Sequence, residues 1–278
     1  MYHAILTING KTVNFTPDYV GNGCYIKTIT GLTGVTSRLE TAQHASGYGE
    51  AYTGATVAAQ TIRIDGYILN DDTMGWLMRK ALIDAIVPKG TGTLTLYHVV
   101  NSDNQTELSI DVVVSATPTI TQEDRARFSF TLYAPRPIWY SSTASAALVQ
   151  QGTTESINVI GQVDAEYTAT IQSVTETLTS VTLTLDGGTR NAQSISLDLT
   201  KYSPSGVASG NFIYIRRVNG QLQVRVNNND AIRALDVTST FWYLPVGAHT
   251  LALTTNANSA AATVAYKAGY AGVIVSGV

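Results

Sequence analysis

Charged residues are scarce in this chain. Only 13% of its 278 residues are Asp, Glu, Lys or Arg, about half of the ~25% that soluble domains usually carry. The 17 basic and 20 acidic residues give a formal net charge of −3, so no basic excess exists to neutralise the phosphates of a nucleic acid. This balance disfavours sequence-independent DNA binding. With 44% apolar residues, the chain is long enough to bury its own core in one or two domains.

Metal-ligating and redox residues are also few. A single cysteine, Cys24, excludes an intramolecular disulfide and any cysteine pair that could hold a metal. We expect it to be a small buried apolar residue. The four histidines, His3, His44, His98 and His249, are scattered and provide no local pair of zinc ligands. The sequence therefore predicts no metal site.

Long hydrophobic runs are missing. The first residues alternate between apolar and polar types and lack the basic and apolar regions of a signal peptide. No stretch is long and apolar enough to cross a bilayer. We expect a soluble protein that is made in the cytoplasm and has no membrane partner.

The composition is typical of a β protein. The chain has 38 Thr, 23 Gly and 15 Tyr, which suit pleated strands and the turns between them. Alternation of apolar and polar residues predicts strands with one buried face. The main runs are 62–68, 94–96, 108–114, 127–134, 167–171, 181–185, 195–199, 212–216, 222–226, 249–253 and 262–266.

One helix interrupts the strands. Asp71 and Asp72 offer N-caps, and Pro88 ends the helical pattern. Between them, apolar residues recur at helical spacing, namely Met74, Leu77, Met78, Ala81, Leu82, Ala85 and Ile86. We expect this stripe to pack on a sheet.

A domain boundary is predicted near residue 140. Pro135 and Pro137 are followed by small polar residues at 141–145, a composition typical of a domain boundary. The first domain would be 1–140, with 10 basic and 12 acidic residues, and the second 141–278, with 7 and 8. Turns at Asp186-Gly187-Gly188 and Asn219-Gly220 separate short strands in the second domain, which predicts an antiparallel sandwich.

No constellation of catalytic residues is present. The chain lacks a GxSxG elbow and a Walker motif, and the glycine-rich run 47–54 has the wrong spacing for a dinucleotide fingerprint. Helix capping explains the carboxylate pair Asp71-Asp72, and a hairpin tip explains Glu123-Asp124. The run 227–230, Asn-Asn-Asn-Asp, could bind calcium by composition only, and a polar turn is preferred. We predict that the protein is not an enzyme and binds no cofactor.

The order of motifs resembles a known family. ITGLTG at 29–34 leads into a Gly- and Tyr-rich loop through Gly54, and TIRIDGYI follows at 61–68. After the helix come FSFTLYAPRPIW at 128–139 and FWYLPVGAHTL at 241–251. Together they resemble the distal tail proteins of long-tailed phages with non-contractile tails.

The resemblance implies a fold and a role. Residues 1–140 would form a β-barrel or sandwich "belt" domain with one helix, and 141–278 a galectin-like antiparallel β-sandwich. The belt domains would assemble as a hexameric ring at the distal tail end. The ring would join the tail tube protein to the hub, the tape measure protein and the receptor-binding protein, at the virion's tail tip. DNA would pass through the channel without specific binding, which suits the acidic balance.

A candidate subunit interface lies in the loop 41–54. Tyr48 and Tyr52, with Gly47 and Gly49, suit a contact with a neighbouring subunit because aromatic residues are enriched at interfaces. We expect this loop to become ordered on that contact.

The alternative function is a carbohydrate-binding, lectin-like adhesion module. Trp242 and Tyr243 are the candidates for stacking on a sugar ring. A core tryptophan at a strand start is the preferred explanation of Trp242, because large aromatic residues are highly buried on average.

Overall fold

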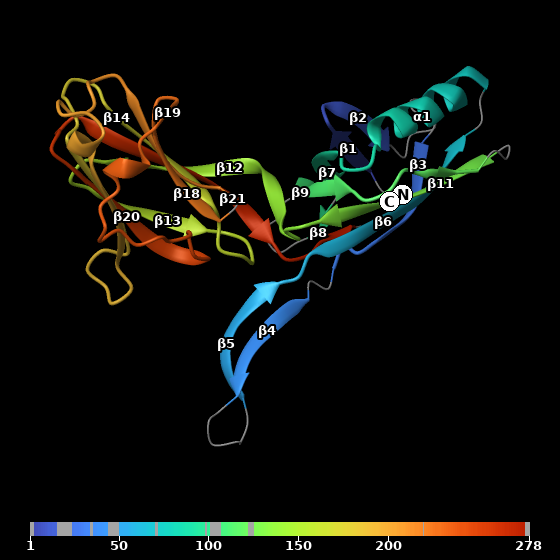
Figure 1. The fold of residues 1–278 in the computed structure, drawn as a ribbon, viewed down its shortest axis with the longest axis horizontal. Coiled ribbons are helices and arrows are strands. Elements are labelled where there is room, and N and C mark those ends of the chain that lie inside the picture. Colours follow the sequence, from blue (N-terminus) through green and yellow to red (C-terminus); the bar gives the residue numbers. More distant parts are fainter. Residues whose placement is uncertain are drawn as a thin grey trace. The chain divides into compact units, whose positions relative to one another are not determined.

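The protein folds into two compact units (Figure 1). The computed structural model describes residues 3–15, 24–33, 36–43, 50–69, 72–97, 99–100, 107–121, 125–218 and 220–275. Unit 1 comprises Met1–Ser142 and Tyr270–Val278, and unit 2 comprises Thr143–Gly269. Strands dominate both units, and the described residues contain one α-helix, so the predicted mainly β class is confirmed.

Unit 1 is built on one antiparallel sheet. Its strands lie in the order β2 (Lys11–Phe15), β1 (Ala4–Ile8), β7 (Thr91–Tyr97), β9 (Glu107–Val114), β11 (Arg125–Ala134), β6 (Gln60–Leu69) and β3 (Cys24–Thr30). One short strand, β10 (Thr119–Ile120), adds to this sheet by pairing with β11. β8 (Val99–Val100) and β22 (Ile274–Val275) pair in a separate two-stranded sheet. Alternate residues of β9 and β11 are buried, as their sequence pattern predicts.

The sheet of unit 1 curls around an aromatic cluster. Phe15 on β2 lies 5.8 Å from Phe128 and 6.2 Å from Phe130 on β11, measured between ring centroids. Strands from distant parts of the sheet order therefore face each other. The ring of Phe128 covers Gly66 on β6, where an added Cβ would overlap both that ring and the Tyr25 carbonyl of β3. Glycine at this position lets β3, β6 and β11 approach closely.

Helix α1 (Asp72–Ala85) packs against β2 and β6. Leu82, Ala85 and Ile86 are buried, as predicted. Leu77 is 41% exposed, so its predicted place in the core stripe was wrong. Leu77 and Leu82 are five residues apart, about 140° around the helix, and the sheet covers only the side that carries Leu82.

Residues 41–54 are not one continuous loop. β4 (Ser37–Gln43) and β5 (Glu50–Val57) pair as a two-stranded sheet, with a register shift between Glu40 and Thr41. Of the predicted loop, residues 41–43 and 50–54 lie in strands. Residues 44–49 lie outside the described residues. β-Branched and aromatic residues such as Thr41 and Tyr52 favour the paired conformation on either side of them.

Unit 2 is a sandwich of two antiparallel sheets. One has the order β19 (Asn229–Asp230), β18 (Gln221–Val226), β17 (Phe212–Val218), β14 (Tyr167–Ser173), β21 (Ala260–Tyr270) and β12 (Trp139–Gln150). The other has the order β13 (Thr154–Val159), β20 (Gly247–Thr255), β15 (Ser180–Leu185) and β16 (Gln193–Asp198). The predicted sandwich is present.

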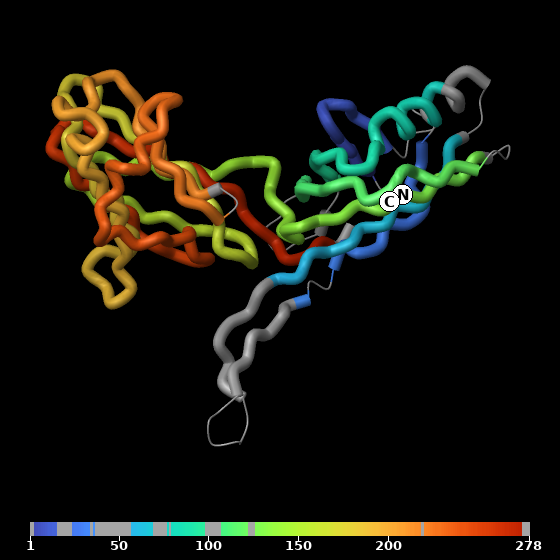
Figure 2. The backbone as a smooth tube through the Cα atoms, in the orientation of Figure 1, coloured from blue at the N-terminus to red at the C-terminus, as the bar shows by residue number. Residues whose placement is uncertain are grey.

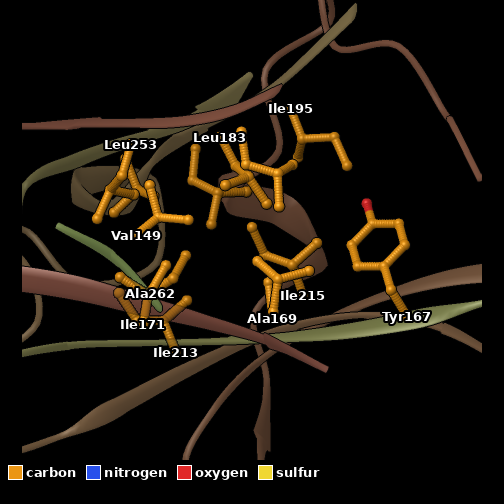
Figure 3. Packing of buried hydrophobic residues seen from close by; sticks show 14 of the residues in the cluster. Val149, Tyr167, Ala169, Ile171, Leu183, Ile195, Ile213, Ile215, Leu253 and Ala262 are labelled. Carbon is orange, nitrogen blue, oxygen red and sulfur yellow. The ribbon is translucent and has the colours of Figure 1, made fainter. Parts of the chain in front are cut away.

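The core of unit 2 lies between these sheets. Ile171 and Ile213 from one sheet point toward Leu183 and Leu253 from the other, and all four are buried (Figure 3). Burial of such aliphatic side chains is the main term that holds the two layers together, at roughly 1.5 to 3 kcal/mol for each residue.

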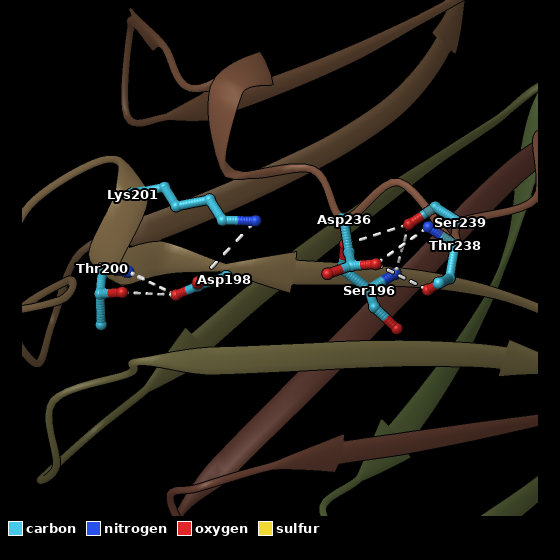
Figure 4. A network of polar contacts seen from close by, with 7 residues as sticks. All are labelled: Ser196, Asp198, Thr200, Lys201, Asp236, Thr238 and Ser239. Carbon is cyan, nitrogen blue, oxygen red and sulfur yellow. Dashed lines mark hydrogen bonds and ion pairs between the residues drawn. The ribbon is translucent and has the colours of Figure 1, made fainter.

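A segment of chain covers one edge of the four-stranded sheet of unit 2. The N–H groups of Asp236 and Thr240 donate to the carbonyls of Ser196 and Ser194 on β16, both at 2.8 Å. In return, the Ser196 N–H donates to Ser239 Oγ at 3.0 Å (Figure 4). Asp236 holds this segment by accepting from the Thr238 N–H and hydroxyl, and these bonds lower the pKa of Asp236. The edge is therefore satisfied without a regular strand.

The residues at the predicted domain boundary, 141–145, form part of a strand. β12 runs from Trp139, which is fully buried, through the boundary at 142/143 to Gln150. Tyr140 and Ser141 pair with β9, and Ser141 is buried, so the small polar residues belong to a sheet. The chain enters unit 2 along β12 and leaves it at the end of β21, after which residues 270–275 belong to unit 1 (Figure 2).

The helix content also bears on membrane association. No helix within the described ranges is long and apolar enough to cross a bilayer.

Candidate functional site: interaction surfaces

Trp242, a sugar-stacking candidate, belongs to the core of unit 2. It is 2% exposed, and its ring stacks on Tyr167 with centroids 4.4 Å apart and planes 15° from parallel. Burial raises the pKa of Tyr167 well above its usual range, although the charge of Arg217 acts in the opposite sense. The interpretation of Trp242 as a core residue is therefore confirmed, and its face is closed to a sugar.

Tyr243, the second stacking candidate, is half-buried. The guanidinium carbon of Arg217 lies 4.0 Å from its ring centroid. This cation–π contact covers one face of the ring. Together with the burial of Trp242, it disfavours a sugar-stacking platform at 242–243.

The predicted subunit-interface residues are only partly described. Tyr52 lies on β5, opposite Thr41, but its side chain is outside the described part of the structure. Gly47, Tyr48 and Gly49 also lie outside it. Their role at a subunit interface therefore stays a prediction.

The cysteine and histidines have structural surroundings. Burial raises the pKa of the Cys24 thiol to about 12, which keeps it protonated and unreactive at neutral pH. His3 stacks on Tyr97 with ring centroids 4.2 Å apart. His249 Nδ1 lies 2.7 Å from Asp186 Oδ2 at one end of the sandwich. His44 and His98 lie outside the described residues.

Asp186 ties a hairpin turn to β20. Its carboxylate contacts His249 and accepts from the Thr250 N–H at 2.9 Å. Burial alone would raise the pKa of Asp186, but the two hydrogen bonds and the charge of His249 outweigh it, so the pKa is lowered. Among the described residues, His249 Nε2 is buried without a hydrogen-bond partner. The pair therefore fixes a turn.

The carboxylate and amide clusters suggested by the sequence are turn residues where they are described. Asn227 accepts from the Phe212 N–H, and Asp230 accepts from the Ile232 N–H. Within the described residues, no three His, Cys, Asp or Glu side chains converge on a point that could hold a metal. Asp71, Glu123 and Asp124 lie outside those residues.

The two outer faces of the unit 2 sandwich differ sharply in chemistry. On the strands of the four-stranded sheet, the outward positions carry small or polar residues, and they include no aromatic and no basic side chain. They are Thr154, Ser156, Asn158, Ala248, Thr250, Ala252, Thr254, Ser180, Thr182, Thr184, Ser194, Ser196 and Asp198. Some of these hydroxyls bond to one another, as Thr182 and Ser196 do at 3.0 Å.

On the six-stranded sheet, large side chains gather on the outer side of β17 and β18. Phe212, Tyr214 and Arg216 follow one another on the outer side of β17, since the residues between them, Ile213 and Ile215, are fully buried. The rings of Phe212 and Tyr214 stack at 6.2 Å, and the Arg216 guanidinium carbon lies 5.3 Å from the Tyr214 centroid.

Neighbouring strands extend this surface. Thr170 on β14 lies opposite Tyr214, as does Arg225 on β18, and Gln223 lies opposite Arg216. We call this surface the Tyr214 face, defined by Thr170, Phe212, Tyr214, Arg216, Gln223 and Arg225. The sequence indicated it only as an alternating run at 212–216. One signal in the sequence could have revealed it: the positions of that run that face solvent, where polar residues are usual, hold Phe212, Tyr214 and Arg216.

Comparison with known proteins assigns the chain. Residues 160–270, almost all of unit 2, match the family model described as siphovirus-type tail component, C-terminal domain. Unit 2 thus contains the C-terminal domain of a siphovirus-type tail component. The protein is a structural component of the phage tail tip in the virion, not an enzyme. The sequence-based resemblance is confirmed.

The fold of the whole tail component has solved counterparts. The crystal structure of the SPP1 Dit (gp 19.1) protein, described as a paradigm of hub adsorption apparatus in phages that infect Gram-positive bacteria, matches with TM-score 0.68 and 12% identity. The match covers 96% of this chain and 98% of that one, so both units share the Dit fold. The phage P2 baseplate in its activated conformation with Ca matches with TM-score 0.47 and 10% identity over 96% of this chain and 97% of that one. A search of the curated proteins found no match.

Proposed function

We propose that this tail component forms a closed, hexameric ring at the distal end of the tail. The ring joins the tail tube protein to the hub, the tape measure protein and the receptor-binding protein. The observation that carries the proposal is the Dit fold, which extends over both units, together with the tail-component match of residues 160–270.

The low charge of the chain supports an assembled state. A ring requires a heterologous interface, in which one surface of a subunit meets a different surface of its neighbour. Interfaces are depleted in Lys, Glu and Asp, and 13% charged residues leave much surface suited to such contacts. We assign part of this interface to the hairpin of β4 and β5, with Gly47, Tyr48, Gly49 and Tyr52.

The acidic balance supports passage of DNA through the ring. Each phosphate that a protein neutralises adds salt-dependent affinity, so a channel that conducts DNA must not be strongly basic. The segment up to residue 140 has 10 basic and 12 acidic residues. A ring built from it would let DNA move without specific binding.

The test is the mass and image of the purified full-length chain. We expect a closed ring of about six subunits by mass photometry and electron microscopy at high protein concentration. A variant in which a short Gly/Ser linker replaces residues 44–49 should form the ring more weakly than the parent. The matched control replaces the exposed turn 187–191 of unit 2 in the same way and should leave assembly unchanged.

Two results would overturn these proposals. A strict monomer at high concentration would contradict the ring. Full assembly of the 44–49 variant would contradict the assignment of Tyr48 to the interface while leaving the ring itself in place.

A further inference from the structure

We infer that the Tyr214 face binds an acidic, extended segment of another protein. The inference concerns unit 2 alone and does not depend on ring formation. It starts from the contrast between the two outer faces of the sandwich, which share one core but differ in the residues they present to solvent.

The composition of the Tyr214 face is that of an interface centre. Tyrosine and arginine are the residues most often found at binding hot spots, whereas serine and threonine are under-represented there. The outer face of the four-stranded sheet is rich in serine and threonine, whereas the Tyr214 face carries tyrosine and arginine. Phe212 remains 38% exposed, although its ring is stacked on Tyr214. A partner that covered this column would bury aromatic area that the chain itself leaves open.

The charge of the face specifies the partner. Arg216 and Arg225 lie on it, and Lys267 is exposed on β21 of the same sheet. None of the three forms an ion pair in the described structure, and Arg225 forms none even with Asp230, its neighbour in the β18–β19 ladder. Within β14, β17, β18 and β21, no outward position holds a carboxylate. The carboxylate that comes next to these strands, Glu166 just before β14, accepts from the Gly220 N–H at 2.9 Å. A cationic face on a chain of net charge −3 is complementary to an acidic partner.

The spacing of the face fits an extended segment. Alternate side chains of a strand are about 7 Å apart, so Phe212, Tyr214 and Arg216 form a row about 13 Å long. A peptide in extended conformation repeats with the same spacing. Its apolar side chains would cover Phe212 and Tyr214 while a carboxylate reached Arg216. Arg225, one strand away from Tyr214, would take a second carboxylate.

The test uses a fluorescent glutamate–tyrosine copolymer as the probe and the full chain as the receptor. Fluorescence anisotropy at physiological salt should show binding that the double variant Arg216→Glu/Arg225→Glu weakens at least about tenfold. Tyr214→Ala should weaken it several-fold. The matched control, Arg190→Glu in the exposed turn at 187–191 of the same unit, should stay within about twofold of the parent. A lysine–tyrosine copolymer should not bind.

The location of binding is read by hydrogen exchange. We expect the copolymer to protect β14, β17 and β18, and the melting temperature of each variant to show that it is folded. If Tyr214→Ala does not fold, the arginine variants still decide the question, because both arginines are half-buried on the outer side of their strands and lie outside the core cluster.

Other outcomes would overturn the inference. Equal loss of affinity in Arg190→Glu would show a general charge effect, and protection of β13 and β20 would place the site on the other face. Binding of an oligo-dT or a sulfated polysaccharide as tight as that of the copolymer would show a surface for polyanions in general. Absence of copolymer binding would remove the proposal altogether.

Discussion

The two units use the same two devices to bring neighbouring backbone segments together, but to different extents. In unit 1, Gly31, Gly66 and Gly92 each lie where a Cβ would come within 1.8 to 2.0 Å of a backbone carbonyl oxygen of the adjacent segment. In the described part of unit 2 the tightest such approach is 2.5 Å, at Gly206, and polar side chains reach across to backbone groups, as those of Asn256 and Gln151 do. Unit 1 therefore depends more on the absence of side chains, and unit 2 more on their hydrogen bonds. Substitutions should fail for different reasons in the two units.

The largest expected effect is in unit 1. Gly66→Ala would force a methyl group into the Tyr25 carbonyl and the Phe128 ring, so β3 or β11 must move. We expect a loss of about 3 kcal/mol in the free energy of unfolding, as for severe overpacking. Chemical denaturation, followed by hydrogen exchange for each unit, measures this loss. The matched control is Gly187→Ala in unit 2, where the nearest atom lies 3.4 Å from the added Cβ. Equal losses in the two variants would break the comparison.

A smaller effect is expected at Asn256 in unit 2. Its Oδ1 accepts from the N–H groups of Thr179 at 2.8 Å and Ser180 at 3.1 Å, and its Nδ2 donates to the Thr177 carbonyl at 2.9 Å. Asn256→Ala should cost about 1 to 2 kcal/mol, because water replaces part of these bonds at an exposed site. Asn256→Asp keeps the acceptor and should cost less than Asn256→Ala. Asn191→Ala, at an exposed turn, serves as the control, and a cost there equal to that of Asn256→Ala would refute the argument.

The smallest effect depends on pH. The pKa of Asp186 is lower in the folded protein than its ordinary value, so its carboxylate stabilises the fold above about pH 4 and loses that effect as the pH falls further. At pH 5, Asp186→Asn should be less stable than the parent by about 1 kcal/mol, and the difference should shrink at pH 3. Thermal unfolding at the two pH values measures it. Glu155→Gln, an exposed position on β13, should show no such change, and a constant difference for Asp186→Asn would contradict the assignment.

The sequence predicted what alternation and spacing determine locally. The strand at 127–134 and the helix ending before Pro88 are present because burial of every second or every third to fourth residue is a property of a single segment. Which strands pair with each other could not be predicted from the pattern of a single segment. The order in which β14, β17 and β18 lie side by side, and hence the Tyr214 face, depends on contacts between residues far apart in the chain.

What the sequence missed or left open has the same origin. The small polar run at 141–145 predicts a domain boundary by composition, but not that Ser141 pairs with Leu108 of β9 and is buried there. Leu77 has the correct helical spacing for the core stripe, but the sheet beneath α1 does not extend to it. At 242–243, composition allowed a sugar platform beside the preferred core tryptophan, and only the neighbours Tyr167 and Arg217 show how the two rings are packed.

The division of the chain at 142/143 and 269/270 makes unit 2 an insertion within unit 1. The last strand, β22, pairs with β8 of unit 1, so a gene truncated after residue 142 would encode a unit 1 without one of its strands. Deletion of 143–269 with fusion of 142 to 270 preserves every described strand of unit 1 except the distal part of β12. The same two junctions mark where a different sandwich could be grafted. Exchange of modules between tail proteins would need both crossovers at once.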